Sequence, residues 1–206
     1  MGPVIYGGRS MRQQVSKDLF AYWSELKGER LAPDRADIDP GAIKNILADT
    51  FILEVDAEAQ FPLRLSGGRV NALWMREQKG RSFIEFWQPA DRRSVGSAVT
   101  TVVDGVVPVV AGVKTYIEGH SLLELELLLL PLRHFGKTHS RVLGALSPVY
   151  QPEWLGQLRA GPLELISLRV IEAAHAPASA SNVQPFPFAK SARSRPRLVV
   201  YDGDKL

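Results

Sequence analysis

Residues 109–132, VVAGVKTYIEGHSLLELELLLLPL, decide the fold of this chain. Small or apolar side chains occupy every second position from 109 to 117, and leucine occupies every second position from 123 to 129. This alternation is typical of β-strands, whose successive side chains point to opposite faces of a sheet. The stretch therefore predicts two neighbouring antiparallel strands joined by a loop at 119–121.

The loop length sets which residues of the two strands face one another. A three-residue loop pairs Ile117 with Leu123, which places both apolar rows on one face and Lys114 opposite Glu126. A two-residue loop would put the rows on different faces. Glu124 and Glu126 then form a solvated row facing Lys114, which is a simpler interpretation than a catalytic pair of carboxylates.

Leu128 and Leu130 lie on the other face of the second strand, so this end of the strand is expected to be covered on both sides. An amphipathic helix predicted at 11–27 is the expected cover. Ser10 and Gln13 form a capping box at its start, and Gly28 ends it. Its apolar stripe recurs at helical spacing and includes Val15, Leu19, Tyr22, Trp23 and Leu26.

The remaining elements complete a mixed pattern of strands and helices. Further strands are predicted at 51–56 (half-buried), 62–65 and 141–150. Helices are predicted after Asp39-Pro40, in short pieces within 67–87 with a capping box at Ser82 and Glu85, and at 91–103. Residues 163–170 are compatible with a strand, and 173–187 have the composition of a linker. The order is two strands, helices, then three strands.

This order resembles that of a PAS domain, and local phrases strengthen the resemblance. Residues 19–47 are similar to the opening of the alphaproteobacterial PAS_5 family. The matching phrases include Tyr22-Trp23, Gly28, Arg30, Pro33, Asp37-Ile38-Asp39-Pro40, Gly80-Arg81-Ser82-Phe83, Trp87 and Leu143-Gly144-Ala145-Leu146. The resemblance spans about residues 16–150. The chain departs from it at Gly67-Gly68-Arg69, where the family has a Gly-Thr pair, which leaves the local helix start open.

The resemblance implies an α+β fold, with a PAS-like five-stranded antiparallel sheet, short helices on one face, an N-terminal helical cap and an irregular C-terminal tail. The expected divisions are 1–50 for the helical cap, 51–150 for the PAS-like core and 151–206 for a C-terminal extension with a basic tail. The family supplies no catalytic residue to transfer to this chain.

Composition fits one intracellular domain. The 206 residues are 45% hydrophobic and carry a formal net charge of +3, and this chain length suits one core with flanking segments. No cysteine is present, which excludes disulfides and thiolate chemistry. No run approaches the roughly 20 apolar residues of a membrane span, and residues 1–12 lack the apolar stretch of a secretory signal. A cytoplasmic location without membrane contact is expected.

Catalytic and metal-binding patterns are weak. The four histidines, at 120, 134, 139 and 175, lack metal-ligand spacing. No Gly-rich phosphate loop is found, and the helix at 91–103 has no histidine to ligate haem iron. We expect no catalytic residue, no metal and no cofactor.

Two sets of side chains are candidates for ligand contact. A small-molecule pocket between sheet and helices would be lined by Trp74, Phe83, Phe86, Trp87, Val99 and Val103. The competing interpretation is that these side chains fill the space as core. The candidates for anion binding are Arg76, Lys79, Arg81, Arg193, Arg195 and Arg197, for which a solvated surface is the simpler interpretation.

These observations predict a stand-alone sensory or regulatory protein that acts in signal transduction through an unidentified signalling partner. The alternative is a nucleic-acid-associated regulator that uses the basic C-terminal tail. A homodimer is expected, with Leu19, Tyr22, Trp23 and Leu26 at or beside the interface. The competing interpretation is that the helix only caps its own domain.

Overall fold

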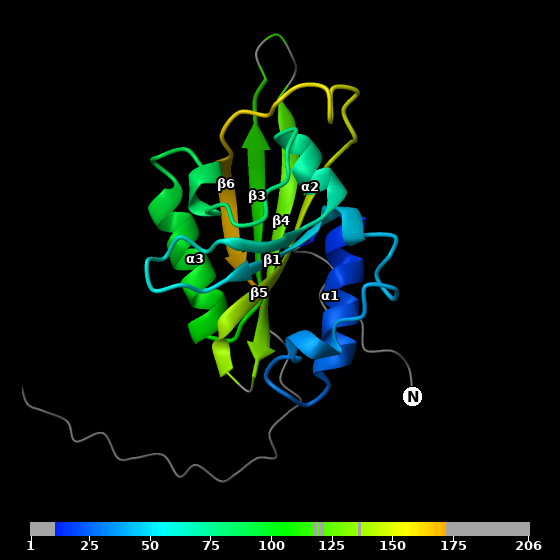
Figure 1. Ribbon diagram of the computed structural model, residues 1–206, viewed down its shortest axis with the longest axis vertical. Coiled ribbons are helices and arrows are strands. Elements are labelled where there is room, and N and C mark those ends of the chain that lie inside the picture. The colour runs from blue at the N-terminus through cyan, green and yellow to red at the C-terminus, as the bar shows by residue number, and fades with distance from the viewer. Residues whose placement is uncertain (1–10, 118, 120–121, 136, 172–206) are drawn as a thin grey trace, which may run out of the picture. The chain divides into compact units, whose positions relative to one another are not determined.

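One antiparallel sheet organises the computed structural model, which describes residues 11–117, 119, 122–135 and 137–171. The strands lie in the order β2-β1-β5-β4-β3-β6 (Figure 1). They are β1 Thr50–Glu54, β2 Leu63–Ser66, β3 Val109–Thr115, β4 Leu123–His134, β5 Lys137–Pro148 and β6 Glu164–Val170. The helices are α1 Gln14–Lys27, α2 Gly68–Leu73 and α3 Arg92–Asp104, with single 3₁₀ turns η1 Arg35–Asp37, η2 Leu47–Asp49 and η3 Ile84–Phe86. The α+β fold is confirmed, with six strands rather than the five predicted.

The additional strand is β6, which pairs with β3. The sequence of this segment was compatible with a strand but did not predict one. The side chains of β6 are half-buried or exposed, so apolar and polar residues do not alternate clearly along it. Its ladder with β3 and the ion pair between Lys114 and Glu164, at 3.1 Å, hold it in place. The described residues all lie within one compact unit, Met1–Ala174, and the divisions at 50 and 150 stay a prediction.

The register between β3 and β4 corrects the predicted hairpin. Thr115 pairs with Leu123, and Lys114 pairs with Glu124 rather than Glu126. The ladder ends at Thr115, and the carbonyl of the next residue, Tyr116, accepts the N–H of Gly161 instead, at 3.0 Å. The shift of two residues keeps each side chain on its predicted face.

Two apolar layers lie on opposite faces of the sheet, as α1 and α3 show in Figure 1. On one face α2, η3 and α3 pack against the strands. On the other, Leu19 and Trp23 of α1 pack with Leu128 and Leu130, as predicted. The buried Trp23 Nε1 also donates to the carbonyl of Pro131, at 2.8 Å. The helix is therefore held by both apolar contact and a buried hydrogen bond.

The β1 strand lies between β2 and β5, and its burial was underestimated. The strand predicted here is confirmed, but residues 50–53 are all buried, so the prediction that it is half-buried is wrong. Phe51 pairs with Gly144 of β5, and a Cβ at Gly144 would lie 2.2 Å from the Phe51 ring. The ring therefore occupies space that only a glycine leaves open.

Glu126 is not part of a solvated row. Only 6% of it is exposed, and its carboxylate accepts the backbone N–H groups of Arg12, at 2.7 Å, and Gln13, at 3.0 Å. The helix begins at Gln14, with Gln13 as an N-cap whose side chain makes no capping bond, while Ser10 lies outside the described residues. A carboxylate from the sheet thus binds the free amides at the helix start.

Two local predictions about the other helices are also corrected, and one open point is settled. The segment after Asp39-Pro40 forms turns that end in η2 rather than an α-helix. Ser82 does not cap η3, because its hydroxyl donates to Gln60 and Phe83 occupies the N-cap. The open helix start is resolved at Gly68.

The backbone of η2 lies close to Gly67, the residue before α2. A Cβ at Gly67 would lie 2.3 Å from the carbonyl oxygen of Leu47, so the backbone of η2 approaches this residue closely. Arg69 then forms two hydrogen bonds to the buried carboxylate of Asp49, at 2.7 and 2.6 Å. These contacts join η2 to α2, and the hydrogen bonds to Asp49 raise the pKa of Arg69.

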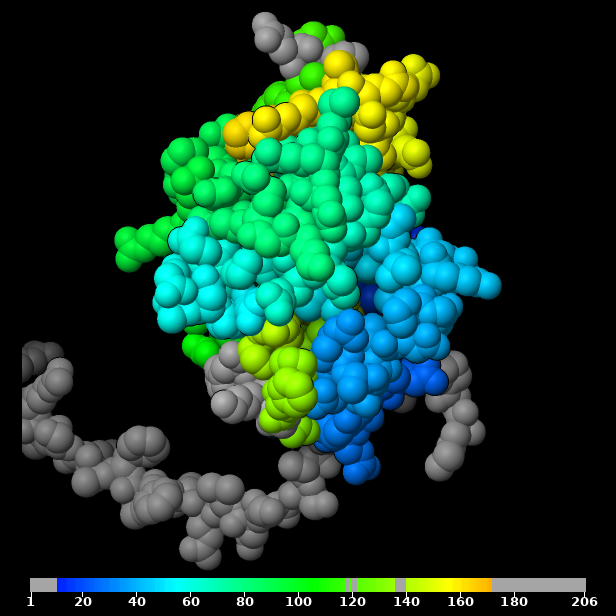
Figure 2. Space-filling view, viewed as in Figure 1, coloured from blue at the N-terminus to red at the C-terminus, as the bar shows by residue number. Residues whose placement is uncertain are grey.

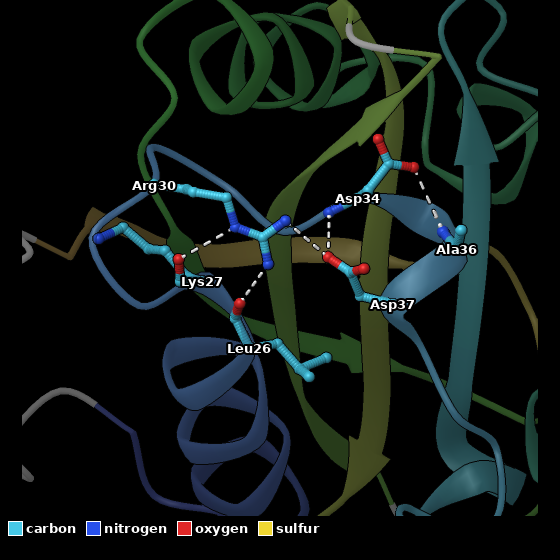
Figure 3. Close-up of polar contacts among 6 residues, drawn as sticks. All are labelled: Leu26, Lys27, Arg30, Asp34, Ala36 and Asp37. Carbon is cyan, nitrogen blue, oxygen red and sulfur yellow. Dashed lines mark hydrogen bonds and ion pairs between the residues drawn. The ribbon is translucent and has the colours of Figure 1, made fainter.

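The end of α1 is fixed by Arg30 (Figure 3). Its guanidinium donates to the carbonyls of Leu26 and Lys27 and lies 2.8 Å from the carboxylate of Asp37. The Asp37 carboxylate also accepts the N–H of Asp34, at 3.0 Å. That bond, followed by the bond from Arg30, lowers the pKa of Asp37. The loop after α1 is therefore tied back to the last turn of the helix.

Candidate functional site

The six predicted pocket side chains meet in the layer between the sheet, α2, η3 and α3. All belong to one apolar cluster, and none is more than 7% exposed: Trp74, Phe83, Phe86, Trp87, Val99 and Val103. The rings of Trp74 and Phe86 stack with centroids 4.4 Å apart, and Phe83 meets the Trp87 ring edge to face at 5.8 Å. These rings occupy one another's contact surfaces as a packed core.

One polar atom of this cluster has no partner among the described residues. The Nε1 of Trp87 is buried and makes no hydrogen bond there. An unpaired buried donor costs about 1–3 kcal/mol. Among the pocket candidates, Trp87 is thus the one whose buried donor has no partner within the described part of the chain.

An open cleft of about 530 Å³ lies at the edge of the same layer. We name it the arginine cleft after Arg76, Arg81, Arg92 and Arg159, which line it. Glu85 contributes the acidic side chain of the lining, and Trp74 and Phe86 form part of the wall. Arg76 and Arg81 were predicted as anion-binding candidates. Lys79 is exposed and does not line the cleft.

Each arginine is brought to the cleft by a different segment. Beyond α2, Met75 adopts a left-handed conformation with φ of 55°, and the N–H of Arg76 donates to Asn71. The carbonyl of Arg81 accepts the N–H of Leu63, which ties this segment to β2. Arg92 is the first residue of α3, and its Nε donates to the carbonyl of Trp87 at 3.1 Å.

Arg159 comes from the loop between β5 and β6, which sequence analysis assigned to an extension. The loop is fixed by the N–H of Ala160, which donates to Leu73 at 2.7 Å, and by the N–H of Leu163, which donates to Phe86 at 2.7 Å. Figure 2 shows this yellow segment beside the green surface of the helical layer. Sequence analysis missed Arg92 and Arg159 because neither stands near the basic run that holds Arg76 and Arg81.

The cleft concentrates positive charge. Partial desolvation of this exposed side chain, then the nearby charges of Arg81 and Arg159, lower the pKa of Arg76. The closest acidic contact is long, with 3.6 Å between Arg81 and Glu85. The Nε of Arg81 is buried and makes no hydrogen bond within the described residues. The four guanidinium groups are therefore only partly neutralised by protein groups.

A second opening is an apolar groove of about 510 Å³ between β1, β2 and the turns that precede β1. Leu47 and Leu65 line it and are 39% and 48% exposed. Its charged lining residues are Arg35 and Lys44. It shares no lining residue with the arginine cleft, so the two surfaces can be altered separately. We call it the leucine groove.

The predicted dimer residues divide into two pairs. Leu19 and Trp23 are 0% and 1% exposed, because they pack against their own sheet. This burial agrees with the competing interpretation, in which the helix caps its own domain. Tyr22 and Leu26 are half-buried, and the Tyr22 hydroxyl accepts the N–H of Asp39 at 2.8 Å. The homodimer stays a prediction.

The basic tail is not part of the described structure. Arg193, Arg195 and Arg197 lie outside the described residues, so the nucleic-acid alternative stays a prediction.

Within the described residues, no three His, Cys, Asp or Glu side chains are grouped as a metal would require. The His134 ring lies 4.2 Å from that of Phe135. Across the described part of the chain, no helix has the length and apolar character that a membrane crossing demands.

The family of the chain follows from these features and from comparison with known proteins. Residues 11–147 match the PAS_5 family, described as a PAS domain. The chain therefore belongs to this family, and PAS domains are sensory and signalling domains. Its alphaproteobacterial origin stays a prediction. Among curated proteins, none matches the sequence.

Solved structures with partial similarity include a PAS domain from Colwellia psychrerythraea, with 13% identity and a TM-score of 0.41 over 54% of this chain and 98% of that one. An RNA-binding light-oxygen-voltage receptor has 17% identity and a TM-score of 0.40 over 57% and 35%. A sensory box sensor histidine kinase from Vibrio cholerae has 11% identity and a TM-score of 0.35 over 53% and 90%.

Proposed function

We propose that this PAS domain regulates a signalling protein by direct contact, and that the leucine groove is the docking surface. The exposure of Leu47 and Leu65 beside the edge strand β2 supports this role. Exposed apolar side chains gathered in a groove are typical of protein-binding surfaces. The proposed role is regulatory rather than catalytic.

The charges of the groove define the partner's chemistry. Arg35 and Lys44 are the charged residues of its lining, and both are basic. A peptide segment with apolar side chains flanked by acidic residues complements this surface. Leucine side chains of the groove then supply the contact area, while the basic pair orients the segment.

The core behind the groove is proposed to transmit this contact as a packed unit. Phe51 lines the groove and also stacks on Phe83, with ring centroids 5.5 Å apart. A displacement of Phe51 by a docked segment therefore presses directly on the aromatic cluster. Under this proposal the purified protein has the mass of the chain alone in native mass spectrometry, and a copurifying small molecule would instead favour the pocket.

The docking proposal is tested by affinity capture with three tagged proteins. The wild type, a Leu47→Asp/Leu65→Asp variant and a Leu31→Asp control are incubated with native lysate. Leu31 is 66% exposed and outside the groove. A protein recovered with the wild type and the control, and lost with the groove variant, is the expected result. Circular dichroism must show that all three are folded.

The proposal fails if the groove variant is folded and recovers the same proteins as the wild type, or if no partner is recovered by any of them. An identified partner allows a direct measurement with purified components. Its affinity for the groove variant should fall at least tenfold, since two buried leucine contacts are lost.

We also propose a homodimer in which Tyr22 and Leu26 lie beside the contact, while Leu19 and Trp23 remain within their own domain. Leu26→Asp is expected to give a folded monomer. Trp23→Asp is expected to destabilise the fold, because Trp23 is 1% exposed against its own sheet. Light scattering of the wild type at high micromolar concentration would reject the dimer if it gave a monomer mass.

A further inference from the structure

We infer that the arginine cleft is a binding site for a small, multiply charged oxyanion, such as a phosphate-bearing or polycarboxylate metabolite. This site is distinct from the proposed docking surface, since the cleft and the leucine groove have no lining residue in common. The inference does not depend on a protein partner.

The first support is the convergence of like charges from separate segments. Arg76 follows α2, Arg92 begins α3, and Arg159 lies in the loop before β6. Surface arginines that repel one another ordinarily spread into solvent, but the backbone contacts of Ala160 and Leu163 fix the loop beside the cleft. The fold therefore holds these charges together at an electrostatic cost. An anion in the cleft would offset that cost.

The second support is the number of unused guanidinium donors. Each guanidinium has five N–H groups in a planar fork that fits phosphate and carboxylate oxygens. Among the described residues, Arg92 uses one donor on the Trp87 carbonyl, and Arg81 has only a 3.6 Å contact with Glu85. Most of the fork positions in the cleft are therefore available to a ligand.

The third support is the size and shape of the space. A volume of about 530 Å³ lies within the range of about 300–1,000 Å³ that is typical of small-molecule sites. Trp74 and Phe86 are 5% and 7% exposed and stack on each other, so they give the cleft a rigid wall. The two rings leave little surface on which a ligand could stack. The ligand is therefore defined by its negative charge rather than by an aromatic group.

The site is tested by isothermal titration of the full chain with two probes, inorganic pyrophosphate and citrate, at fixed ionic strength. The two probes separate phosphate from carboxylate ligands. The variant Arg159→Gln removes one cleft charge from an exposed loop position. The matched control is Arg93→Gln, which makes the same charge change at an exposed α3 residue outside the cleft lining. The basic tail is the same in every protein.

The wild type is expected to bind at least one probe. Arg159→Gln should weaken that binding about tenfold or more, because a charge-assisted hydrogen bond is lost, and Arg93→Gln should change it less than about twofold. In the absence of anion, Arg159→Gln should melt at the same temperature as the wild type or higher, since a like charge is removed. A variant that merely misfolds would melt lower.

Two results would overturn the inference. One is the absence of binding by both probes, and in that case binding of duplex DNA that is lost in Arg159→Gln would assign the cleft to nucleic acid. The other is equal binding by Arg159→Gln and Arg93→Gln, which would assign the anion to general surface charge or the tail.

Discussion

The carboxylate of Glu126, in the middle of β4, accepts the backbone N–H of Arg12 at 2.7 Å. It also accepts the N–H of Gln13, so one buried side chain of the sheet binds two amides at the start of α1. The helix is therefore fixed just before its first residue by charge and along its length by Leu19 and Trp23.

Glu126→Gln is expected to lower the free energy of unfolding by about 1–3 kcal/mol, because a neutral amide has only one acceptor oxygen for two amides. Urea denaturation measures this change. Glu124→Gln, at an exposed position two residues away on β4, is the control and should change stability by less than about 0.5 kcal/mol. Equal effects of the two substitutions would contradict the capping role.

Gly144→Ala is expected to destabilise the fold by about 1–3 kcal/mol through overpacking. Its Cβ would lie 2.2 Å from the Phe51 ring. Thermal denaturation measures the loss, and Phe51→Leu should reduce the cost of Gly144→Ala when both are present. At Gly68 a Cβ meets nothing within 4 Å, so Gly68→Ala should be neutral or stabilising by up to about 1 kcal/mol. Additive effects at residues 51 and 144 would reject direct crowding.

Arg69→Met is expected to cost about 2–3 kcal/mol, since it leaves the Asp49 carboxylate buried without its two charged donors. Asp49 is 1% exposed. Chemical denaturation of Arg69→Met, Asp49→Asn and the double variant measures the coupling between these residues. The double variant should be more stable than the sum of the single effects predicts. A coupling energy near zero would show that the pair does not join η2 to α2.

Asp37→Asn is expected to lower the melting temperature at pH 7 but not in strong acid. The N–H of Asp34, then Arg30, lowers the pKa of Asp37 in the folded state. Its stabilising contribution is therefore present above the unfolded pKa of about 3.9 and is lost as pH falls through the lower folded value. Melting curves from pH 7 to about pH 2 test this window. The control is Glu29→Gln, an exposed neighbour, and a difference that persists at the lowest pH would contradict the assignment.

Sequence analysis succeeded where the signal was local. The alternation at 109–132 predicted β3 and β4, and the apolar stripe predicted that α1 covers Leu128 and Leu130. The predicted pairing register was wrong, since Thr115 pairs with Leu123, and Tyr116 bonds to Gly161, a partner that the hairpin sequence does not contain. Glu126 was likewise predicted to be solvated, because its hydrogen-bond partners are distant in sequence. They are the amides at the start of α1.

The candidate site was predicted only in part. Arg76 and Arg81 were identified from a basic run, whereas Arg159 reaches the cleft through a loop whose position depends on Leu73 and Phe86. The six pocket candidates lie in the layer beside the sheet, where their rings pack against one another, and their role in binding a ligand stays a prediction. Periodicity reports which face a side chain occupies, and it does not report the space left between side chains.

The position of β6 has a consequence for biosynthesis. A ribosome makes β3 long before β6, so the nascent chain exposes one edge of β3 until the residues through Val170 have emerged. Exposed strand edges recruit strands from other chains. A transcript with a premature stop codon between Pro148 and Glu164 would therefore yield an aggregation-prone product and a substrate for chaperones and proteases, although it would still encode residues 11–147.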